Sequence, residues 1–128
     1  VLLAEDNEIN TLLTVSLLKR MGHTVDAVRD GLEAVTATQA RRYDLVLMDV
    51  HMPGLDGMEA TVKIRSLEAE DQTQRRLPIV ALTASAMDED RIRCLAAGMD
   101  DFLTKPIDRA ALTAALARWT TSRSSKAA

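Results

Sequence analysis

Five polar side chains in this sequence stand directly at the ends of short apolar runs. The runs VLLA, LVLM, IVAL and DFLT are followed by Glu5 with Asp6, by Asp49, by Thr83 and by Lys105. Carboxylate and hydroxyl oxygens are ligands of hard cations, and an ammonium can share the charge of a phosphoryl group. If these groups met in space, they would form a site for a cation and a phosphoryl group.

The elements that carry these residues decide whether they meet. Short apolar runs cover residues 1–4, 24–28, 45–48, 79–82 and 101–104, and amphipathic segments cover 9–21, 32–42, 58–69, 88–97 and 108–119. Five strands that alternate with five helices predict an α/β fold with a parallel sheet covered on both faces. Most of the runs are continuously apolar rather than alternating, which is typical of strands buried on both faces.

Several residues mark where helices and the domain should end. Gly22 and Gly98 are expected as C-terminal caps, and Asp88 and Asp108 as N-terminal caps. No repeat or linker interrupts residues 1–119, which predicts one domain, while the polar residues 120–128 read as a flexible tail or the start of a linker. Because the chain begins on a strand without a methionine, we expect it to be part of a longer protein.

Composition excludes several classes of function. The net charge of −3 and the scattered arginine pairs argue against direct nucleic-acid binding by this domain. No apolar stretch approaches the ~20 residues needed to span a bilayer, so no membrane contact by this domain is expected. The single cysteine, Cys94, fits a reducing compartment and reads as a small apolar filler. We therefore expect a cytoplasmic domain, which leaves open a membrane anchor in the parent protein.

The parallel sheet predicts where the polar residues gather. Ligands of open parallel sheets bind at the carboxyl ends of the strands, where the winding direction switches. Carboxylates brought together there repel one another, and burial raises their pKa values unless a cation is supplied. Oxygen ligands with room for water suit Mg²⁺, which would let a carboxylate meet a phosphoryl group.

Each residue by itself has a simpler explanation. Glu5 and Asp6 could belong to a solvated loop before the first helix, and Thr83 and Lys105 could be ordinary strand-end groups. The His51 side chain reads as a loop residue, because no second histidine or cysteine stands at ligand spacing. Their joint placement at the same ends of four candidate strands argues against coincidence.

Four stretches carry a resemblance to a known family. LLAEDN, LVLMDVHMPGLDG, IVALTASAM and FLTKPI, in this order and spacing, resemble the receiver domain of two-component response regulators over nearly the whole chain, residues 1–119. EDNEIN and ALTASAM are most similar to receivers of hybrid sensor histidine kinases. The resemblance implies a flavodoxin-like, doubly wound three-layer sandwich with a five-stranded parallel sheet of order 2-1-3-4-5.

The resemblance also implies an acceptor and a metal site. It makes Asp49 the phospho-acceptor. It implies that Asp6, Asp49 and the backbone carbonyl of His51 hold Mg²⁺, with Glu5 acting mainly through water.

Further residues are assigned to the phosphoryl group and to a switch. The resemblance implies that Thr83 hydrogen-bonds a phosphoryl oxygen and that Lys105 pairs with the phosphate. Phe102 matches the aromatic switch position, and Ala84 leaves space for its ring to move. His51 and Ser85 match positions that border the path of the hydrolytic water.

The implied function is a signalling switch rather than a turnover enzyme. The donor would be a phosphohistidine on a histidine kinase dimerisation domain or a histidine phosphotransfer protein, and slow autodephosphorylation would reset the switch. A phosphatase of the haloacid dehalogenase type would need a second aspartate where His51 stands, and a flavodoxin-like flavin binder would need a phosphate loop where EDNEIN stands. A hybrid-kinase module and a detached or DNA-binding regulator both remain open.

The first helix predicts a partner surface. At 3.6 residues per turn, Leu13, Leu17, Leu18 and Met21 gather on one side, where we expect the sheet, and Ile9, Leu12 and Val15 fall nearly opposite. In receivers this region docks on the helical bundle that presents the phosphohistidine. We expect Ile9 and Leu12, with Pro106 and Ile107 on the same edge, to contact the donor.

Overall fold

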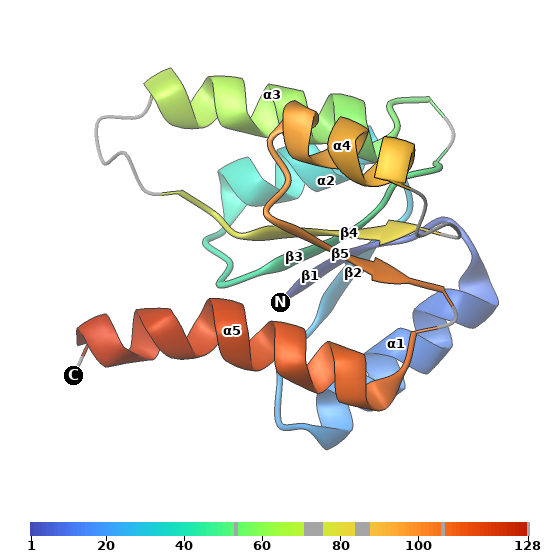
Figure 1. Cartoon of the computed structure of the whole chain (residues 1–128), viewed down its shortest axis with the longest axis vertical. Coiled ribbons are helices and arrows are strands. Elements are labelled where there is room, and N and C mark those ends of the chain that lie inside the picture. Colours follow the sequence, from blue (N-terminus) through green and yellow to red (C-terminus); the bar gives the residue numbers. More distant parts are fainter. Residues whose placement is uncertain (53, 71–75, 84–87, 106, 128) are drawn as a thin grey trace.

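The computed structural model describes residues 1–52, 54–70, 76–83, 88–105 and 107–127 (Figure 1). Its strands are β1 (Leu2–Ala4), β2 (Asp26–Val28), β3 (Val46–Asp49), β4 (Ile79–Thr83) and β5 (Asp101–Thr104). Its helices are α1 (Glu8–Arg20), α2 (Gly31–Ala40), α3 (Gly57–Glu70), α4 (Asp88–Ala97) and α5 (Arg109–Ala127). Strands and helices alternate as the sequence predicts.

The strands form one parallel sheet of order β2-β1-β3-β4-β5, which confirms the predicted fold class. Helices α1 and α5 cover one face, and α2, α3 and α4 cover the other (Figure 1). The winding therefore changes direction between β1 and β3, and all strands end at the same edge. That edge carries the polar residues of the sequence motifs.

Helices cover both faces of the sheet, and alternate residues of each strand point to opposite faces, so each strand contributes to two apolar clusters. Leu2, Val46, Met48 and Ile79 pack toward α2 and α3, where Ile64 is their central helical partner. The opposite cluster contains strand residues and helical residues of α1 and α5: Leu3, Leu47, Val80, Leu82, Leu18, Leu112 and Leu116. Two apolar layers thus hold the strands in place and fix the positions of their ends.

Helix ends agree in part with the predicted caps. Gly22 and Gly98 have φ values of 88° and 109°, in the left-handed region expected after a helix. The Asp108 carboxylate accepts a hydrogen bond from the Ala111 N–H at 3.2 Å, as expected for an N-cap. Asp88 is already the first residue of α4, so its predicted cap position is wrong by one residue.

Helix α5 is longer than predicted. It runs to Ala127, whereas the sequence pattern predicts its end near Trp119. The residues beyond Trp119 contain neither Gly nor Pro, so nothing in their types stops a helix. The division into a domain of residues 1–119 and a tail stays a prediction. Within the described residues, no helix is both long enough and apolar enough to cross a bilayer.

The face that α1 turns to the sheet also differs from the projection. Thr14 and Leu18 are buried and Val15 packs against the core, whereas Leu13 is 61% exposed. The predicted placement of Leu13 and Val15 was therefore wrong. The buried face of α1 includes Thr14, and a helical projection that counts only apolar residues leaves a threonine out.

Candidate functional site

Three of the predicted residues meet at the carboxyl edge of the sheet through one ammonium group. Asp49 ends β3 and Glu5 follows β1, and they are only 2% and 3% exposed. Lys105, directly after β5, places its Nζ 3.0 Å from a carboxylate oxygen of each. Parallel strands that end together explain why residues so distant in sequence are neighbours.

An oxygen site for a cation lies beside this contact. Glu5, Asp6 and Asp49 each offer a carboxylate oxygen, and these oxygens lie within 4.8 Å of one another. Asp6 is exposed, so the cluster opens to solvent and leaves room for water ligands. An all-oxygen, partly hydrated donor set with excess negative charge fits Mg²⁺ better than softer metals.

The charge of the site is not balanced by the protein. Burial raises the pKa of Asp49 to about 6, with further increases from Glu5 that oppose the lowering effect of Lys105. Burial also tends to lower the pKa of Lys105, but its bonds to Asp49 and Glu5 prevail and the pKa lies above its ordinary value. Lys105 therefore stays charged at neutral pH and pairs with two of the three carboxylates in the cluster. A bound cation would relieve this repulsion.

The loop after β3 approaches Asp49 closely. The His51 N–H donates a hydrogen bond of 3.2 Å to Asp49 Oδ1, which orients the carboxylate, and the His51 side chain is exposed. At the other end of the loop, a Cβ on Gly57 would collide with the Asp49 carbonyl, and the Gly57 N–H donates to the Val50 carbonyl at 3.0 Å. Glycine at position 57 is thus required for α3 to begin against the site.

The predicted switch residues occupy one face of the sheet. Thr83 is buried at the end of β4, and Phe102 on β5 is half-buried against the core under α2, α3 and α4. Phe102 pairs with Ala81, two residues before Thr83, so the ring and the hydroxyl are diagonal neighbours on that face. Ala84, Ser85 and Pro106, which the sequence also singled out, lie outside the described residues.

The predicted partner surface is exposed in part. Ile9 and Leu12 on α1 are 68% and 65% exposed, and Leu13 joins them. Ile107 instead is half-buried and packs against the cluster under α1 and α5. Leu13 was missed because the projection assigned it to the sheet.

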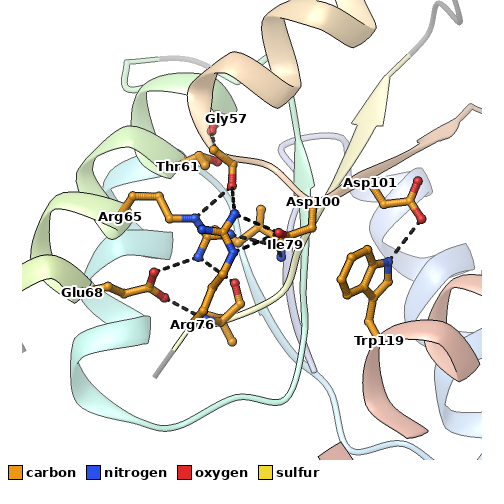
Figure 2. A network of polar contacts seen from close by, with 11 residues as sticks. Gly57, Thr61, Arg65, Glu68, Arg76, Ile79, Asp100, Asp101 and Trp119 are labelled. Carbon is orange, nitrogen blue, oxygen red and sulfur yellow. Dashed lines mark hydrogen bonds and ion pairs between the residues drawn. The ribbon is translucent and has the colours of Figure 1, made fainter. Parts of the chain in front are cut away.

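A second polar cluster, which the sequence analysis missed, lies at the opposite edge of the sheet (Figure 2). Arg65 of α3 donates to the Gly98 carbonyl at 2.9 Å, to Asp100 at 2.9 Å and to Glu68 at 2.8 Å. Arg76 pairs with Asp100 at 2.8 Å. We call Arg65, Glu68, Arg76 and Asp100 the distal cluster.

The distal cluster joins three segments of the chain. Asp100 accepts from the Ile79 N–H and Glu68 accepts from the Leu77 N–H, so carboxylates of the cluster also bond the start of β4. The next residue, Asp101, points to the other face and accepts from the Trp119 indole of α5 at 3.2 Å (Figure 2). The start of β5 is thereby tied to helices on both sides.

Comparison with known proteins identifies the class. Residues 1–117 match the model of the family described as response regulator receiver domain, and the chain belongs to this family. It is therefore a receiver domain of two-component signalling.

Individual relatives agree with this assignment. The chain is 52% identical over 120 residues to Sensor protein GacS of Pseudomonas syringae pv. syringae, covering 94% of this chain and 13% of that protein. It is 40% identical over 135 residues to Probable histidine kinase 1 of Oryza sativa subsp. indica, covering 84% and 14%. The chain thus spans only about a seventh of the length of these curated relatives.

Solved structures of similar chains agree as well. The receiver domain of sensor histidine kinase PA1611 from Pseudomonas aeruginosa PAO1, with a magnesium ion coordinated in its active site cleft, has a TM-score of 0.83 at 45% identity, covering 94% of this chain and 95% of that one. The receiver domain of Ssk1 from Saccharomyces cerevisiae, solved with the histidine phosphotransfer protein Ypd1, gives 0.88 at 33% identity, covering 95% and 88%.

Proposed function

We propose that Asp49 is the phospho-acceptor of this receiver domain. The observation that carries the proposal is a buried carboxylate at a strand end, fixed by the His51 N–H and paired with the Lys105 ammonium. In the step, an Asp49 oxygen attacks the phosphorus of a phosphohistidine, the new O–P bond forms, and the N–P bond breaks. The electron pair of that bond stays on the imidazole nitrogen, and the product is an aspartyl phosphate.

The remaining site residues have supporting roles in this proposal. Glu5, Asp6, Asp49 and the backbone carbonyl of His51 would hold Mg²⁺, with Glu5 acting mainly through water. When bound, the ion would neutralise charge on the carboxylate and the phosphoryl oxygens. Lys105 would pair with the transferred phosphoryl group, and Thr83 would donate a hydrogen bond to one of its oxygens.

The product would act as a switch signal. An aspartyl phosphate adds negative charge and acceptor oxygens beside Thr83, which favours an inward position of that hydroxyl. Phe102, its diagonal neighbour on the same face, would change position with it. The domain is then a phospho-accepting switch that hydrolyses its own phosphate slowly, with no turnover of a separate substrate.

We further propose that the phosphohistidine donor docks on α1. A histidine kinase dimerisation domain or a histidine phosphotransfer protein presents its histidine on a helical bundle, and the exposed Ile9 and Leu12 offer an apolar contact beside the site. The donor surface would include Pro106 and the exposed part of Ile107. The domain would work in the cytoplasm as one module of a hybrid histidine kinase.

Substitution of Asp49 tests the acceptor. Asp49→Asn should abolish labelling both by a phosphorylated histidine phosphotransfer protein and by acetyl phosphate with Mg²⁺, as followed by intact mass. Glu59→Gln, on the exposed first turn of α3, is the matched control and should be labelled like the parent. A phosphoryl adduct of parental yield on Asp49→Asn would refute the assignment.

A comparison of two donors tests the docking surface. Ile9→Ala combined with Leu12→Ala should slow transfer from the protein donor about tenfold or more, the effect of losing one or two apolar contact residues. Labelling by acetyl phosphate should not change, because neither side chain touches the acceptor. Equal slowing with both donors, or no slowing with either, would exclude this surface.

A further inference from the structure

The ring of Phe102 has a cationic neighbour that the proposed switch does not include. Arg91 of α4 places its guanidinium carbon 5.3 Å from the centroid of the Phe102 ring, within the range of a cation–π contact. Because this ring has no hydroxyl, hydrogen bonds cannot orient it. Packing and the Arg91 contact are left to set its position.

The contact is well placed to affect the switch. Cys94, one helical turn after Arg91, is buried toward the sheet, so this side of α4 lies over the strand that carries Phe102. The C-terminal end of α4 is fixed, because the Gly98 carbonyl accepts hydrogen bonds from Arg65 and Arg76 of the distal cluster. Arg91 lies in the N-terminal half of α4, away from the end that these bonds hold.

We propose that Arg91 is a positioning residue that latches the Phe102 ring in its unphosphorylated arrangement. This inference rests on the proposed switch of Thr83 and Phe102. It adds a residue that affects the equilibrium between the inactive and active arrangements before phosphorylation. When the ring follows Thr83 inward, it leaves the guanidinium, and the cation–π contact is lost. The strength of this one contact therefore contributes to the population of the active arrangement before phosphorylation.

The size of the effect follows from the exposure of Arg91. An exposed cation–π contact changes a two-state balance about two- to fivefold. Arg91→Met keeps an apolar side chain of similar length and removes the charge, so it should raise the active population by this factor. Arg91→Lys keeps a cation and should fall between the parent and the Met variant.

The ring can be observed directly, because Phe102 is the only phenylalanine in the sequence. Incorporation of 4-fluorophenylalanine gives one fluorine resonance that reports on this ring. In the parent, phosphorylation with acetyl phosphate and Mg²⁺ should shift the resonance. In unphosphorylated Arg91→Met, the resonance should already lie part of the way toward the phosphorylated position.

Labelling rates provide a second readout in unlabelled protein. Arg91→Met should accelerate labelling by acetyl phosphate two- to fivefold. In a Phe102→Leu background this acceleration should be absent, since the ring is gone. The difference between the two backgrounds removes any general influence of the charge on the anionic donor. Thermal melts of all variants would detect damaged folding.

The outcomes separate the latch from the switch. A fluorine resonance that moves on phosphorylation of the parent, but that Arg91→Met leaves in place before phosphorylation, would overturn the latch alone. A resonance that phosphorylation does not move would overturn the switch, and the latch with it. Labelling that Arg91→Met slows more in the presence of Phe102 than in the Phe102→Leu background would also overturn the latch, because the contact would then belong to the active arrangement.

Discussion

A cluster of charged, partly buried side chains lies at each end of the sheet, and the two clusters differ in how their charges are balanced. At the carboxyl edge the three carboxylates of Glu5, Asp6 and Asp49 gather, and the Lys105 ammonium pairs with Glu5 and Asp49. At the opposite edge, the two carboxylates of the distal cluster meet two guanidinium groups that also bond main-chain carbonyls. Among the described residues, the first cluster has more carboxylates than cationic side chains, and the second has two of each.

This difference suits the cluster at the carboxyl edge to binding a ligand and the distal cluster to holding segments of the chain together. Unbalanced buried charge costs stability unless a ligand supplies the missing charge, so such a site favours binding of that ligand. Paired and hydrogen-bonded charges hold segments of the chain together. Removal of one partner lowers the stability of the protein, because it leaves a buried charge without its counter-charge. The same residue types thus predict opposite responses to substitution at the two edges.

Removal of Arg65 should have the largest effect on stability. Arg65→Met would leave Glu68 and Asp100 short of their buried partner, and we expect a loss of about 2–4 kcal/mol in the free energy of unfolding. Denaturant unfolding monitored by circular dichroism measures it. Arg76→Met is the matched control, because the Arg76 side chain is 58% exposed and should contribute less than about 1 kcal/mol. Equal losses for both variants would contradict the role given to Arg65.

Substitution of Asp49 should change stability in the opposite direction. Folded protein keeps a proton on Asp49 up to about pH 6, against an ordinary value of 3.8, so the folded state binds more protons between these values. Its stability therefore falls as the pH rises through this window. At pH 7.5 without metal, Asp49→Asn should gain about 1–2 kcal/mol after allowance for solvent and for the lost Lys105 pair.

The same measurement at lower pH provides the control for Asp49. As the pH falls below the ordinary value of 3.8, the parent carboxyl becomes protonated in both states, so the advantage of Asp49→Asn should shrink toward zero. Unfolding curves across pH 4 to 7.5 would show a growing difference between the two proteins. A constant difference, or a loss of stability in Asp49→Asn at pH 7.5, would show that the charge of Asp49 does not destabilise the folded protein.

Magnesium should stabilise the parent protein. At ten times its dissociation constant, bound Mg²⁺ would add about 1.4 kcal/mol by mass action. Asp6→Asn should weaken this response. Because a proton on Asp49 competes with the metal, affinity should also fall below pH 6, by up to about tenfold per pH unit. Thermal melts and Mg²⁺ titrations test both points, and identical melts with and without millimolar Mg²⁺ would contradict the proposed site.

The smallest expected effect concerns the lifetime of the phosphorylated form. The exposed His51 side chain borders the proposed site, and His51→Ala should change the rate of dephosphorylation by about two- to fivefold, equivalent to less than about 1 kcal/mol in the barrier. Labelling competence should not change, because the His51 N–H that orients Asp49 remains. The decay of intact phosphorylated protein measures the lifetime, and equal decay rates for parent and variant would remove the idea.

The residues at the carboxyl edge could be predicted from the sequence because the topology of a parallel sheet alone brings them together. Parallel strands end together, so Glu5, Asp49 and Lys105 could be brought to one place without knowledge of a single contact. The helix positions follow from the same alternation, whereas the strand order was implied by the resemblance to receiver domains. What the topology of a sheet dictates can be predicted from the pattern of apolar runs.

The features that were missed depend on side-chain paths rather than on topology. Arg65 and Asp100 are 35 positions apart and meet only because a long side chain folds back across the turn at Gly98. Arg91 reaches Phe102 in the same way. On α1, the buried Thr14 shifted the packed stripe and exposed Leu13. Patterns of residue types carry no signal for such rotations and bends.

Location of the phosphoryl group tests the central claim most directly. The parent protein would be labelled with acetyl phosphate and Mg²⁺, the acyl phosphate reduced with borohydride, and the fragments sequenced by mass spectrometry. Reduction converts the acceptor aspartate into homoserine, with release of phosphate. If Asp49 is the acceptor, homoserine should appear at position 49 and nowhere else. Homoserine at position 6, or at any other aspartate with Asp49 unmodified, would contradict it.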